Sequence, residues 1–223
     1  MTVTVYPLSA SDLTSAEVEA WRGVPVAIAV DLGRDIGQID PAIRPLNPPG
    51  KQSPLFGRAV TALCEPPDFG AVLHALDIVG PGDVLVIAAA GNSEFAMIGE
   101  ILGAQVRRRG GVGVVCDGAV RDVATLAAWP DFSVFARFVT PRGPTSMERG
   151  SVNLPVVVGG RLVTPGDLVI GDDDGLVALS PLAVRSHIMD AKQKQAREAA
   201  WIEDLANGRS VIEMLGLGPP KSV

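Results

Sequence analysis

Two carboxylates and an arginine stand at a spacing that can place them in one pocket. Glu100 is followed, after twenty residues, by the adjacent pair Arg121 and Asp122. Carboxylate oxygens suit Mg²⁺ or Mn²⁺, and a metal held by few carboxylates keeps water molecules that a substrate can displace. An arginine beside them offers a planar set of donors for a carboxylate or a developing enolate oxygen. The plainer alternative is that Asp122 only caps a helix while Arg121 lies in solvent.

The elements around these residues predict that they converge. Apolar runs at 84–88 and 112–116 indicate buried strands, and helices are predicted at 95–109 and at 121–128. This order implies parallel strands joined by right-handed crossovers. Neighbouring strands lie about 4.8 Å apart, and ligands bind in crevices beyond the carboxyl ends of parallel strands. We therefore expect Glu100, Arg121 and Asp122 to meet at one edge of the sheet.

The rest of the chain reads as one mixed α/β domain over residues 1–223. A first helix at 15–22 has Ser11 or Thr14 as its cap, and a long surface excursion is expected at 31–54. Another helix is predicted at 68–78 and a long C-terminal helix at 181–207, ended by Gly208. Short apolar runs predict strands at 24–30, 56–64, 134–139, 156–158, 162–163, 168–170 and 176–179. The last two flank Asp172–Asp174, which we interpret as a structural turn rather than a metal cluster.

Composition narrows the function classes. The chain has 223 residues, of which 47% are apolar and 20% charged, and its formal net charge is −6. The one basic run, Arg107–Arg109, is typical of a last helical turn, so nucleic acid binding is disfavoured. Cys64 and Cys116 lie in apolar runs, which indicates core residues in a cytoplasmic protein. We predict no signal peptide and no membrane span, since no apolar run reaches about 18 residues.

The stretch from Gly99 to Val123, GEILGAQVRRRGGVGVVCDGAVRDV, resembles the signature of the class II pyruvate aldolases. These enzymes cleave 4-hydroxy-4-methyl-2-oxoglutarate and 4-carboxy-4-hydroxy-2-oxoadipate, and their defining motif is an acidic residue, twenty others and an Arg-Asp pair. The stretches 152–180 and 56–62 are also similar to this family, which is related to the regulators of ribonuclease E activity. The resemblance covers most of residues 56–208.

The resemblance implies a fold and an assembly. The expected fold is a β/β/α sandwich similar to the swivelling phosphohistidine domain, with a projecting C-terminal helix. The family forms trimers, sometimes paired into hexamers, with the active site at the subunit interface. A glutamate from that helix of the neighbouring subunit completes the site; Glu198 is the best match here and Glu203 the second choice.

The resemblance also implies roles for the residues around the motif. Asp122 would contact the metal, and Arg121 would hold the pyruvyl part of the substrate and stabilise the enolate. Glu100 would join Asp122 around the water molecules on the metal. The backbone of Gly99, Glu100, Ile101 and Leu102 would receive the substrate carboxylate at a helix start. Asn92 is a further candidate to line the pocket, although an asparagine after a strand is often part of a turn.

The implied reaction is retro-aldol cleavage, with Mg²⁺ or Mn²⁺, of a 4-hydroxy-2-oxo acid to pyruvate and a second oxo acid. Oxaloacetate decarboxylation would follow as a side activity. One departure is Thr125, where many members carry an acidic residue three positions after the aspartate. Two alternatives stay open. One is a lyase for a different oxo acid. The other is a non-enzymatic regulator like the ribonuclease E inhibitors, which generally lack the aspartate found here as Asp122.

Overall fold

A computed structural model describes residues 3–7, 12–33 and 36–218. A mixed sheet dominates it, with the strand order β2-β12-β11-β4-β5-β6-β7-β3. At its centre lie the parallel neighbours β4 (Leu55–Leu63), β5 (Asp83–Ile98), β6 (Gly113–Val120) and β7 (Ser133–Val139), and side chains are mostly buried in β4, in β6 and in the first parts of β5 and β7. Such strands need cover on both faces. The parallel order predicted from the sequence is confirmed.

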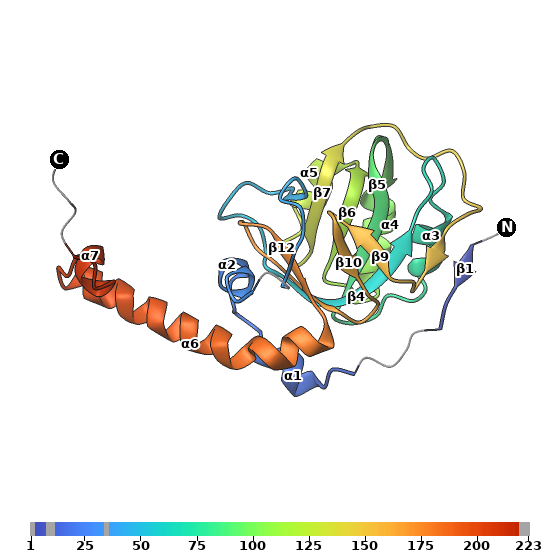
Figure 1. Cartoon of the computed structure of the whole chain (residues 1–223). Helices are drawn as coiled ribbons and strands as arrows, with labels where there is room; N and C mark the ends of the chain where they lie inside the picture. Colours follow the sequence, from blue (N-terminus) through green and yellow to red (C-terminus); the bar gives the residue numbers. More distant parts are fainter. Residues whose placement is uncertain (1–2, 8–11, 34–35, 219–223) are drawn as a thin grey trace.

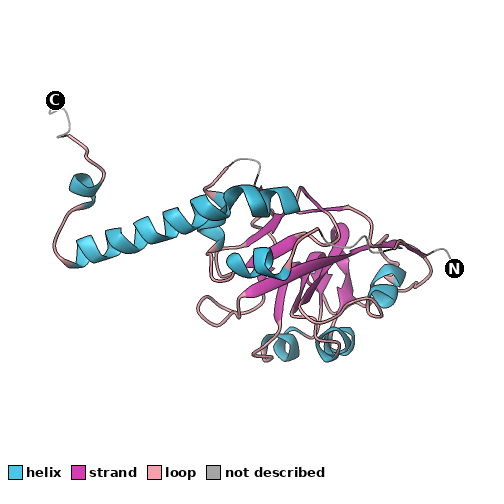
Figure 2. Cartoon of the chain, turned by 90° about the horizontal axis from the view of Figure 1, so that it is seen from below, coloured by secondary structure: helices cyan, strands magenta, loops and turns pink. Residues whose placement is uncertain are grey.

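Helices cover one face of these four strands (Figure 2). They are α3 (Gly70–Ala75), α4 (Glu100–Arg108) and α5 (Val123–Ala127), and each follows a strand in the chain. Their apolar side chains pack with alternate residues of the strands, such as Leu85 and Val114, in one core cluster. Cys64 and Cys116 lie in this cluster, as predicted, and burial raises the pKa of the Cys64 thiol to about 12.

Further strands cover the opposite face. The hairpin of β9 (Val156–Val158) and β10 (Arg161–Val163) packs there with side chains of β11 (Leu168–Gly171) and β12 (Leu176–Leu179). A Cβ on Gly171 would lie 2.9 Å from the ring of Phe135 in β7. In a flat sheet these strands would be about 19 Å apart, so the sheet is curled and its two ends face each other. The predicted β/β/α sandwich is confirmed (Figure 1).

Short strands complete the sheet edges. β2 (Gly37–Gln38) pairs with β12 and β3 (Arg44–Pro45) pairs with β7, while β1 (Thr4–Val5) pairs in parallel with β8 (Ser151–Val152). β2 and β3 lie within the segment 31–54, which the sequence predicts as a long surface excursion, so two short parts of that excursion pair with the sheet.

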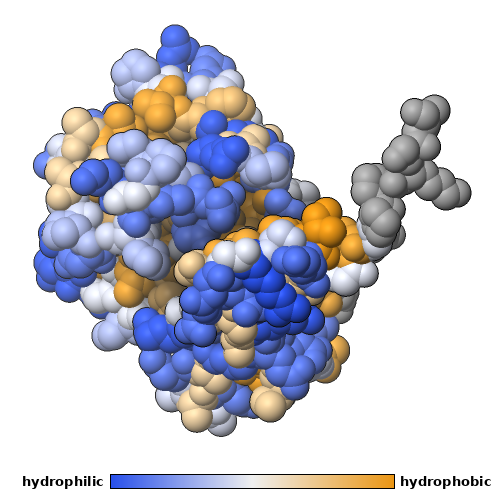
Figure 3. All heavy atoms as spheres, turned by 90° about the vertical axis from the view of Figure 1, so that its left-hand side faces the viewer, coloured by the Kyte–Doolittle hydropathy of each residue, from blue (hydrophilic) through white to orange (hydrophobic). Residues whose placement is uncertain are grey.

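The third core cluster anchors the C-terminal helix. It joins α1 (Ser15–Ala20), α2 (Val26–Val30) and the first turns of α6 (Pro181–Ala206) to β11 and β12. Trp21 is fully buried, and its Nε1 donates to the carbonyl of Val184 at 3.0 Å. The rest of α6, with α7 (Val211–Met214), projects from the body as an arm (Figure 1). Apolar surface lies beside this arm (Figure 3). No described helix has both the length and the apolar character needed to cross a membrane.

Three predictions of local structure were wrong. The strand predicted at 24–30 is absent, and Val26–Val30 form helix α2 instead, because a short apolar run has no periodicity that separates the two. β5 continues through Gly91 and Asn92 to Ile98, so α4 begins at Glu100 rather than near residue 95. β6 likewise runs through 117–118 to Val120. Three register shifts between β5 and β6 let the two strands stay paired over this stretch.

The structure confirms the predicted capping residue Thr14 and the predicted glycines at two helix ends. Thr14 caps α1 in a reciprocal capping box with Glu17, whereas the alternative cap, Ser11, lies outside the described residues. Gly110, with φ +88°, ends α4, and Gly208, with φ +87°, follows the end of α6. Both glycines take the left-handed conformation that favours this residue type at helix ends.

Candidate active site

The Arg-Asp pair lies where β5 and β6 end side by side. Ile98 and Val120 are their last paired residues, and the N–H of Arg121 donates to the carbonyl of Ile98 at 3.1 Å. Gly99 and α4 follow β5, and Asp122 and α5 follow β6. The predicted meeting of these segments at one sheet edge is therefore confirmed.

Asp122 adopts a left-handed backbone conformation, with φ 57° and ψ 35°. This conformation turns its carboxylate back toward the preceding helix, where Oδ2 accepts the N–H of Glu100 at 3.0 Å. Nε of Arg121 lies 3.6 Å from the same oxygen, and the two side chains are 43% and 41% exposed. The side chain of Asp122 makes no capping bond to α5, the helix it precedes. Asp122 therefore accepts a first-turn N–H of α4 and does not cap α5, the helix that follows it. Arg121 lies against the same carboxylate and is not simply solvated.

Two glycines leave room for this pair. A Cβ on Gly99 would lie 2.5 Å from Oδ2 of Asp122 and 2.8 Å from Cγ of Arg121. A Cβ on Gly143 would lie 2.7 Å from Nη1 of Arg121. Any larger residue at either position would push the charged groups aside, so the pair depends on close backbone approach from two segments.

The start of α4 supplies backbone donors next to the pair. First-turn N–H groups have no acceptor within their own helix. The Glu100 N–H is bonded to Asp122, and the N–H groups of Ile101 and Leu102 remain as donors at the positive end of the helix. Anions bind at such helix ends. The opposite end of α4 carries Arg107 and Arg108, as the sequence predicted.

Two recesses share Arg121 and Asp122. The smaller, of about 260 Å³, is lined mainly by apolar side chains around the charged pair: Phe69, Leu73, Ala96, Met97, Ile98, Gly99, Ile101, Leu102, Arg121, Asp122, Gly143 and Pro144. The other, of about 290 Å³, is lined by Arg121, Asp122, Val139, Thr140 and Pro141. The pair therefore stands between two spaces, either of which can hold part of a small substrate.

The outer wall of the smaller recess is held by Asp68. Its carboxylate accepts the hydroxyl of Ser146 and the N–H groups of Gly70, Glu148 and Arg149. Burial alone would raise the pKa of Asp68, but these four hydrogen bonds outweigh it and lower the pKa to about 2. The loop that carries Gly143 and Pro144 is thereby fixed against the start of α3.

Other predicted site residues lie less centrally. Glu100 contributes its backbone to the pair, while its side chain is exposed and is not part of the lining of either recess. Asn92 lies outside both linings, and its Oδ1 accepts the N–H of Phe95 at 2.9 Å, as in a turn. Thr125 is half-buried in α5 and also lies outside both linings.

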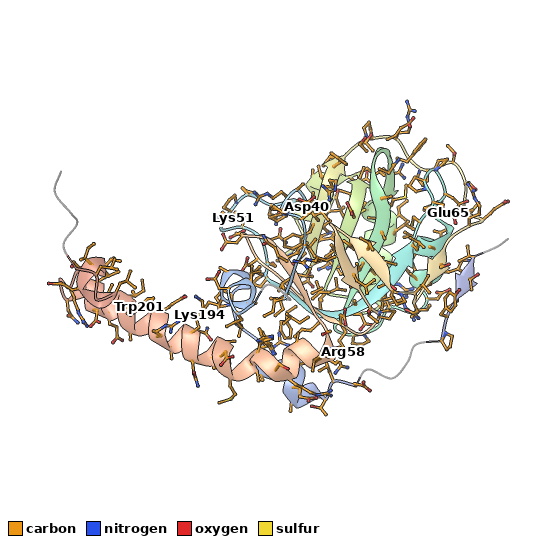
Figure 4. The ribbon with its side chains drawn as sticks, in the orientation of Figure 1. Asp40, Lys51, Arg58, Glu65, Lys194 and Trp201 are labelled. Carbon is orange, nitrogen blue, oxygen red and sulfur yellow. The ribbon has the colours of Figure 1, made fainter. Side chains whose placement is uncertain are left out.

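Glu198 lies on the arm, away from the Arg-Asp pair of its own chain. Its Oε1 is 3.1 Å from Nζ of Lys194, which also lies 3.0 Å from Oδ2 of Asp31 at the end of α2. Figure 4 shows Lys194 and Trp201 on this arm, far from Glu65, which lies beside α3. Within one chain the structure does not bring Glu198 or Glu203 to Asp122.

Sequence reasoning missed the residues that form the apolar wall and its loop. Leu73 lies in α3 and Phe69 directly precedes it, while Gly143 and Pro144 come from the loop after β7. None carries a local chemical signal. Only the folded chain shows that these residues lie close to Arg121. The aspartates at the β11–β12 turn behave as predicted for a turn, since Asp172 and Asp173 accept the N–H groups of Val26 and Gly50.

The donor set of the pair fits a hard divalent cation held mainly by water and substrate. Asp122 offers a partly exposed carboxylate at the mouth of both recesses. Among the described residues no group of three or more His, Cys, Asp or Glu side chains could hold a metal. Mg²⁺ is usually bound by one or two carboxylates and keeps several water molecules, so a single aspartate is compatible with it.

The chain is similar in sequence and in fold to known proteins. A Halalkalibacterium halodurans protein, provisionally named as a 4-hydroxy-4-methyl-2-oxoglutarate aldolase, is 31% identical over 210 residues, which cover 91% of this chain and 98% of that protein. An uncharacterized protein from Pseudomonas syringae has the same fold, with a TM-score of 0.78 at 24% identity over 90% of this chain and 97% of its own. A Streptomyces coelicolor structure, described as an unusual member of the RNase ES inhibitor RraA protein family, has a TM-score of 0.72 at 26% identity, covering 84% of this chain and 96% of its own. Residues 14–178 match the RraA-like family model, described as Aldolase/RraA, and the chain belongs to this family.

Proposed function

We propose that the protein is a divalent-metal-dependent aldolase that cleaves a 4-hydroxy-2-oxo acid to pyruvate and a second oxo acid. The substrates we propose are 4-hydroxy-4-methyl-2-oxoglutarate or 4-carboxy-4-hydroxy-2-oxoadipate. The observation that carries the proposal is the Arg121–Asp122 pair, held beside the free N–H groups of α4 at the ends of two parallel strands. The relative named as an aldolase of the first substrate supports it.

The chain's own groups can perform the steps of this cleavage. The N–H groups of Ile101 and Leu102 bind the C1 carboxylate of the substrate. Water held near Asp122 and Glu100 accepts the proton of the 4-hydroxyl, the C3–C4 bond breaks, and its electron pair becomes the enolate of pyruvate. Arg121 donates to the enolate oxygen, where charge develops. Protonation at C3 then gives pyruvate, and C4 leaves as the carbonyl of the second oxo acid.

A bound Mg²⁺ or Mn²⁺, with Asp122 as its protein ligand, would supply a Lewis acid for the oxo acid end of the substrate. Loss of CO₂ from oxaloacetate yields the same pyruvate enolate, so oxaloacetate decarboxylation is proposed as a side activity. Arg121 would have the same role in both reactions.

The site is proposed to be completed by a neighbouring subunit of a trimer or hexamer, in the cytoplasm. Glu198, or Glu203 as the second choice, would come from the neighbour's arm. The projection of α6, which carries both residues away from their own chain's pair, supports this arrangement (Figure 1). Exposed apolar side chains of Ile101 and Val139 at the rims of the two recesses also support a covered site.

The test is release of pyruvate from the two proposed substrates and from oxaloacetate, coupled to lactate dehydrogenase, with Mg²⁺ or with EDTA. Wild type is compared with Asp122→Ala and with Asp174→Ala, an exposed aspartate whose side chain lies at the β11–β12 turn. Release that needs the metal, disappears in Asp122→Ala and persists in Asp174→Ala supports the proposal. Folded wild type that releases no pyruvate from any of the three would refute it.

A binding regulator is the second candidate function, favoured by the likeness to the S. coelicolor inhibitor-family structure. Binding to ribonuclease E at physiological salt, measured with the purified wild type, separates the two. Tight binding without pyruvate release would favour the regulator. Pyruvate release without binding would favour the enzyme.

A further inference from the structure

The smaller recess has one charged end and one apolar end. Arg121, Asp122 and the first N–H groups of α4 form the charged end. Leu73 of α3 and Phe69, the residue just before this helix, form the opposite wall together with Pro144. Among the described residues that line this recess, Arg121 and Asp122 alone carry charge. A ligand that fills it therefore meets charge at one end and hydrocarbon at the other.

The apolar wall is built before any ligand arrives. Phe69 and Leu73 are half-buried, and both pack against the core cluster beneath them. The N–H of Phe69 donates to the carbonyl of Ser146 at 3.0 Å, and Asp68 bonds three backbone N–H groups and the Ser146 hydroxyl. A Cβ on Gly70 would lie within 2.9 Å of two carbonyl oxygens of this loop, so the loop and α3 are in close contact. These contacts fix the position of the wall.

The other arginines of the loop after β7, Arg142 and Arg149, are paired with carboxylates outside this recess. Nη1 of Arg142 lies 2.7 Å from Oε1 of Glu94, and its guanidinium lies over the ring of Phe95. Arg149 lies 3.5 Å from Glu65 and 3.9 Å from Asp68. The chain thus offers two receivers for substrate carboxylates here, the start of α4 and Arg121, whose five N–H donors can serve a carboxylate as well as the enolate oxygen. A third carboxylate would face the apolar wall without a partner, which is costly.

We propose that Phe69 and Leu73 form a subsite for a short alkyl group on carbon 4 of the substrate. This inference rests on the proposed function and specifies its substrate. The methyl group of 4-hydroxy-4-methyl-2-oxoglutarate fits the subsite and leaves two carboxylates for the two receivers. In 4-carboxy-4-hydroxy-2-oxoadipate the methyl is replaced by a carboxymethyl group, whose charge would lie against Phe69 and Leu73. The protein then prefers the methyl compound and accepts its 4-ethyl homologue.

The first experiment measures kcat/KM for pyruvate release from the methyl, ethyl and carboxymethyl compounds. For wild type we expect the carboxymethyl compound to be at least about tenfold poorer than the methyl compound, since an unpaired carboxylate is desolvated. Leu73→Lys should raise the ratio of carboxymethyl to methyl activity by about tenfold or more, because it places a cation in the wall. Leu162→Lys, at a 66% exposed position on β10, is the charge-matched control and should leave the ratio unchanged.

Two results of this experiment would overturn the subsite. One is wild type that uses the carboxymethyl compound as well as the methyl compound. The other is a ratio that changes in Thr140→Lys but not in Leu73→Lys, since Thr140 lines the other recess and the C4 group would then lie there.

A binding measurement keeps the inference separate from the proposed reaction and from folding of the variants. Wild type with Mg²⁺ is titrated calorimetrically with 4-methyl-2-oxoglutarate and with its 4-carboxymethyl counterpart, which lack the 4-hydroxyl and cannot be cleaved. At least about tenfold tighter binding of the methyl compound supports the subsite even if no substrate releases pyruvate, in which case only the proposed function fails. Equal affinities, or no binding of either compound, would refute the subsite.

Discussion

Replacing Gly99 by alanine is the sharpest perturbation of the site, because the added Cβ would lie 2.5 Å from Oδ2 of Asp122. Ordinary van der Waals contact begins at 3.4 Å, so the carboxylate must retreat by about 0.9 Å or the backbone must shift. The same Cβ would lie 2.8 Å from Cγ of Arg121, so both charged groups are affected. A shift of this size is large enough to break the 3.0 Å hydrogen bond from the Glu100 N–H.

The expected loss of activity is large, and the expected loss of stability is small. A misplacement of about 1 Å can cost about 100-fold in rate, and we expect a loss of this order in kcat/KM together with weaker Mg²⁺ binding. Stability changes less, because one partly exposed hydrogen bond to a carboxylate contributes about 1 kcal/mol. That corresponds to a fall in Tm of about 2–4 °C for a chain of this size.

The assay combines coupled pyruvate release, calorimetric titration with Mg²⁺ and a thermal melt of Gly99→Ala. Gly80→Ala is the matched control, since its Cβ would lie an ordinary 3.6 Å from Oδ2 of Asp83. We expect the control to keep wild-type activity. A Gly99→Ala protein with wild-type metal binding and wild-type turnover would show that the close approach of Gly99 does not hold Asp122 in its working position.

Three further perturbations follow from the structure. Burial raises the pKa of Asp167 to about 6, against an ordinary 3.8, so folding favours the protonated acid and stability falls as pH rises from about 4 to 6. Asp167→Asn should therefore gain about 1–3 kcal/mol at pH 7.5 and nothing near pH 4; equal gains at both pH values in thermal melts would contradict this. Asp68, with a pKa of about 2, stabilises the fold above pH 4, and this contribution is lost as pH falls toward 2. Asp68→Asn should cost about 2 kcal/mol at pH 7 and about half of that at pH 3 in urea unfolding, and a cost independent of pH would count against it. Gly143→Ala places a Cβ 2.7 Å from the flexible end of Arg121, so we expect kcat/KM to fall about three- to tenfold with a lower kcat, because Arg121 donates to the enolate oxygen where charge develops; steady-state kinetics with an unchanged kcat would argue against this role of Arg121.

The sequence predicts the parallel core well because its strands are continuous apolar runs separated by helical segments. It misses the length of β5 and β6, since Gly91, Asn92 and Gly118 are typical of turns. Here the two strands absorb these residues through register shifts while remaining paired. It also mistakes α2 for a strand, because five residues are too few for a helical period to show. The curl that brings Gly171 against Phe135 is a property of the whole sheet and has no local signal.

The candidate site was predictable in its charged part and not in its apolar part. Glu100, Arg121 and Asp122 stand next to strand ends, so their convergence follows from the order of elements alone. Phe69 and Leu73 lie at the start of and within a helix that follows a different strand, and nothing in their types separates them from core residues. Their part in the recess depends on how α3 sits against the loop held by Asp68, which only the folded chain reveals.

The backbone at Asp122 favours an enzyme over a binding regulator. An aspartate directly before a helix commonly caps it, which contributes about 1 kcal/mol. Here α5 lacks that cap, because the left-handed conformation of Asp122 turns the carboxylate toward α4 and Arg121. A left-handed non-glycine residue persists when its surroundings impose it, and Gly99 and Gly143 provide the space that this arrangement needs. A surface that only binds a partner protein has no need for a carboxylate and a guanidinium placed this closely at the mouth of two recesses. A site that must hold an oxo acid and stabilise its enolate needs both groups in this position.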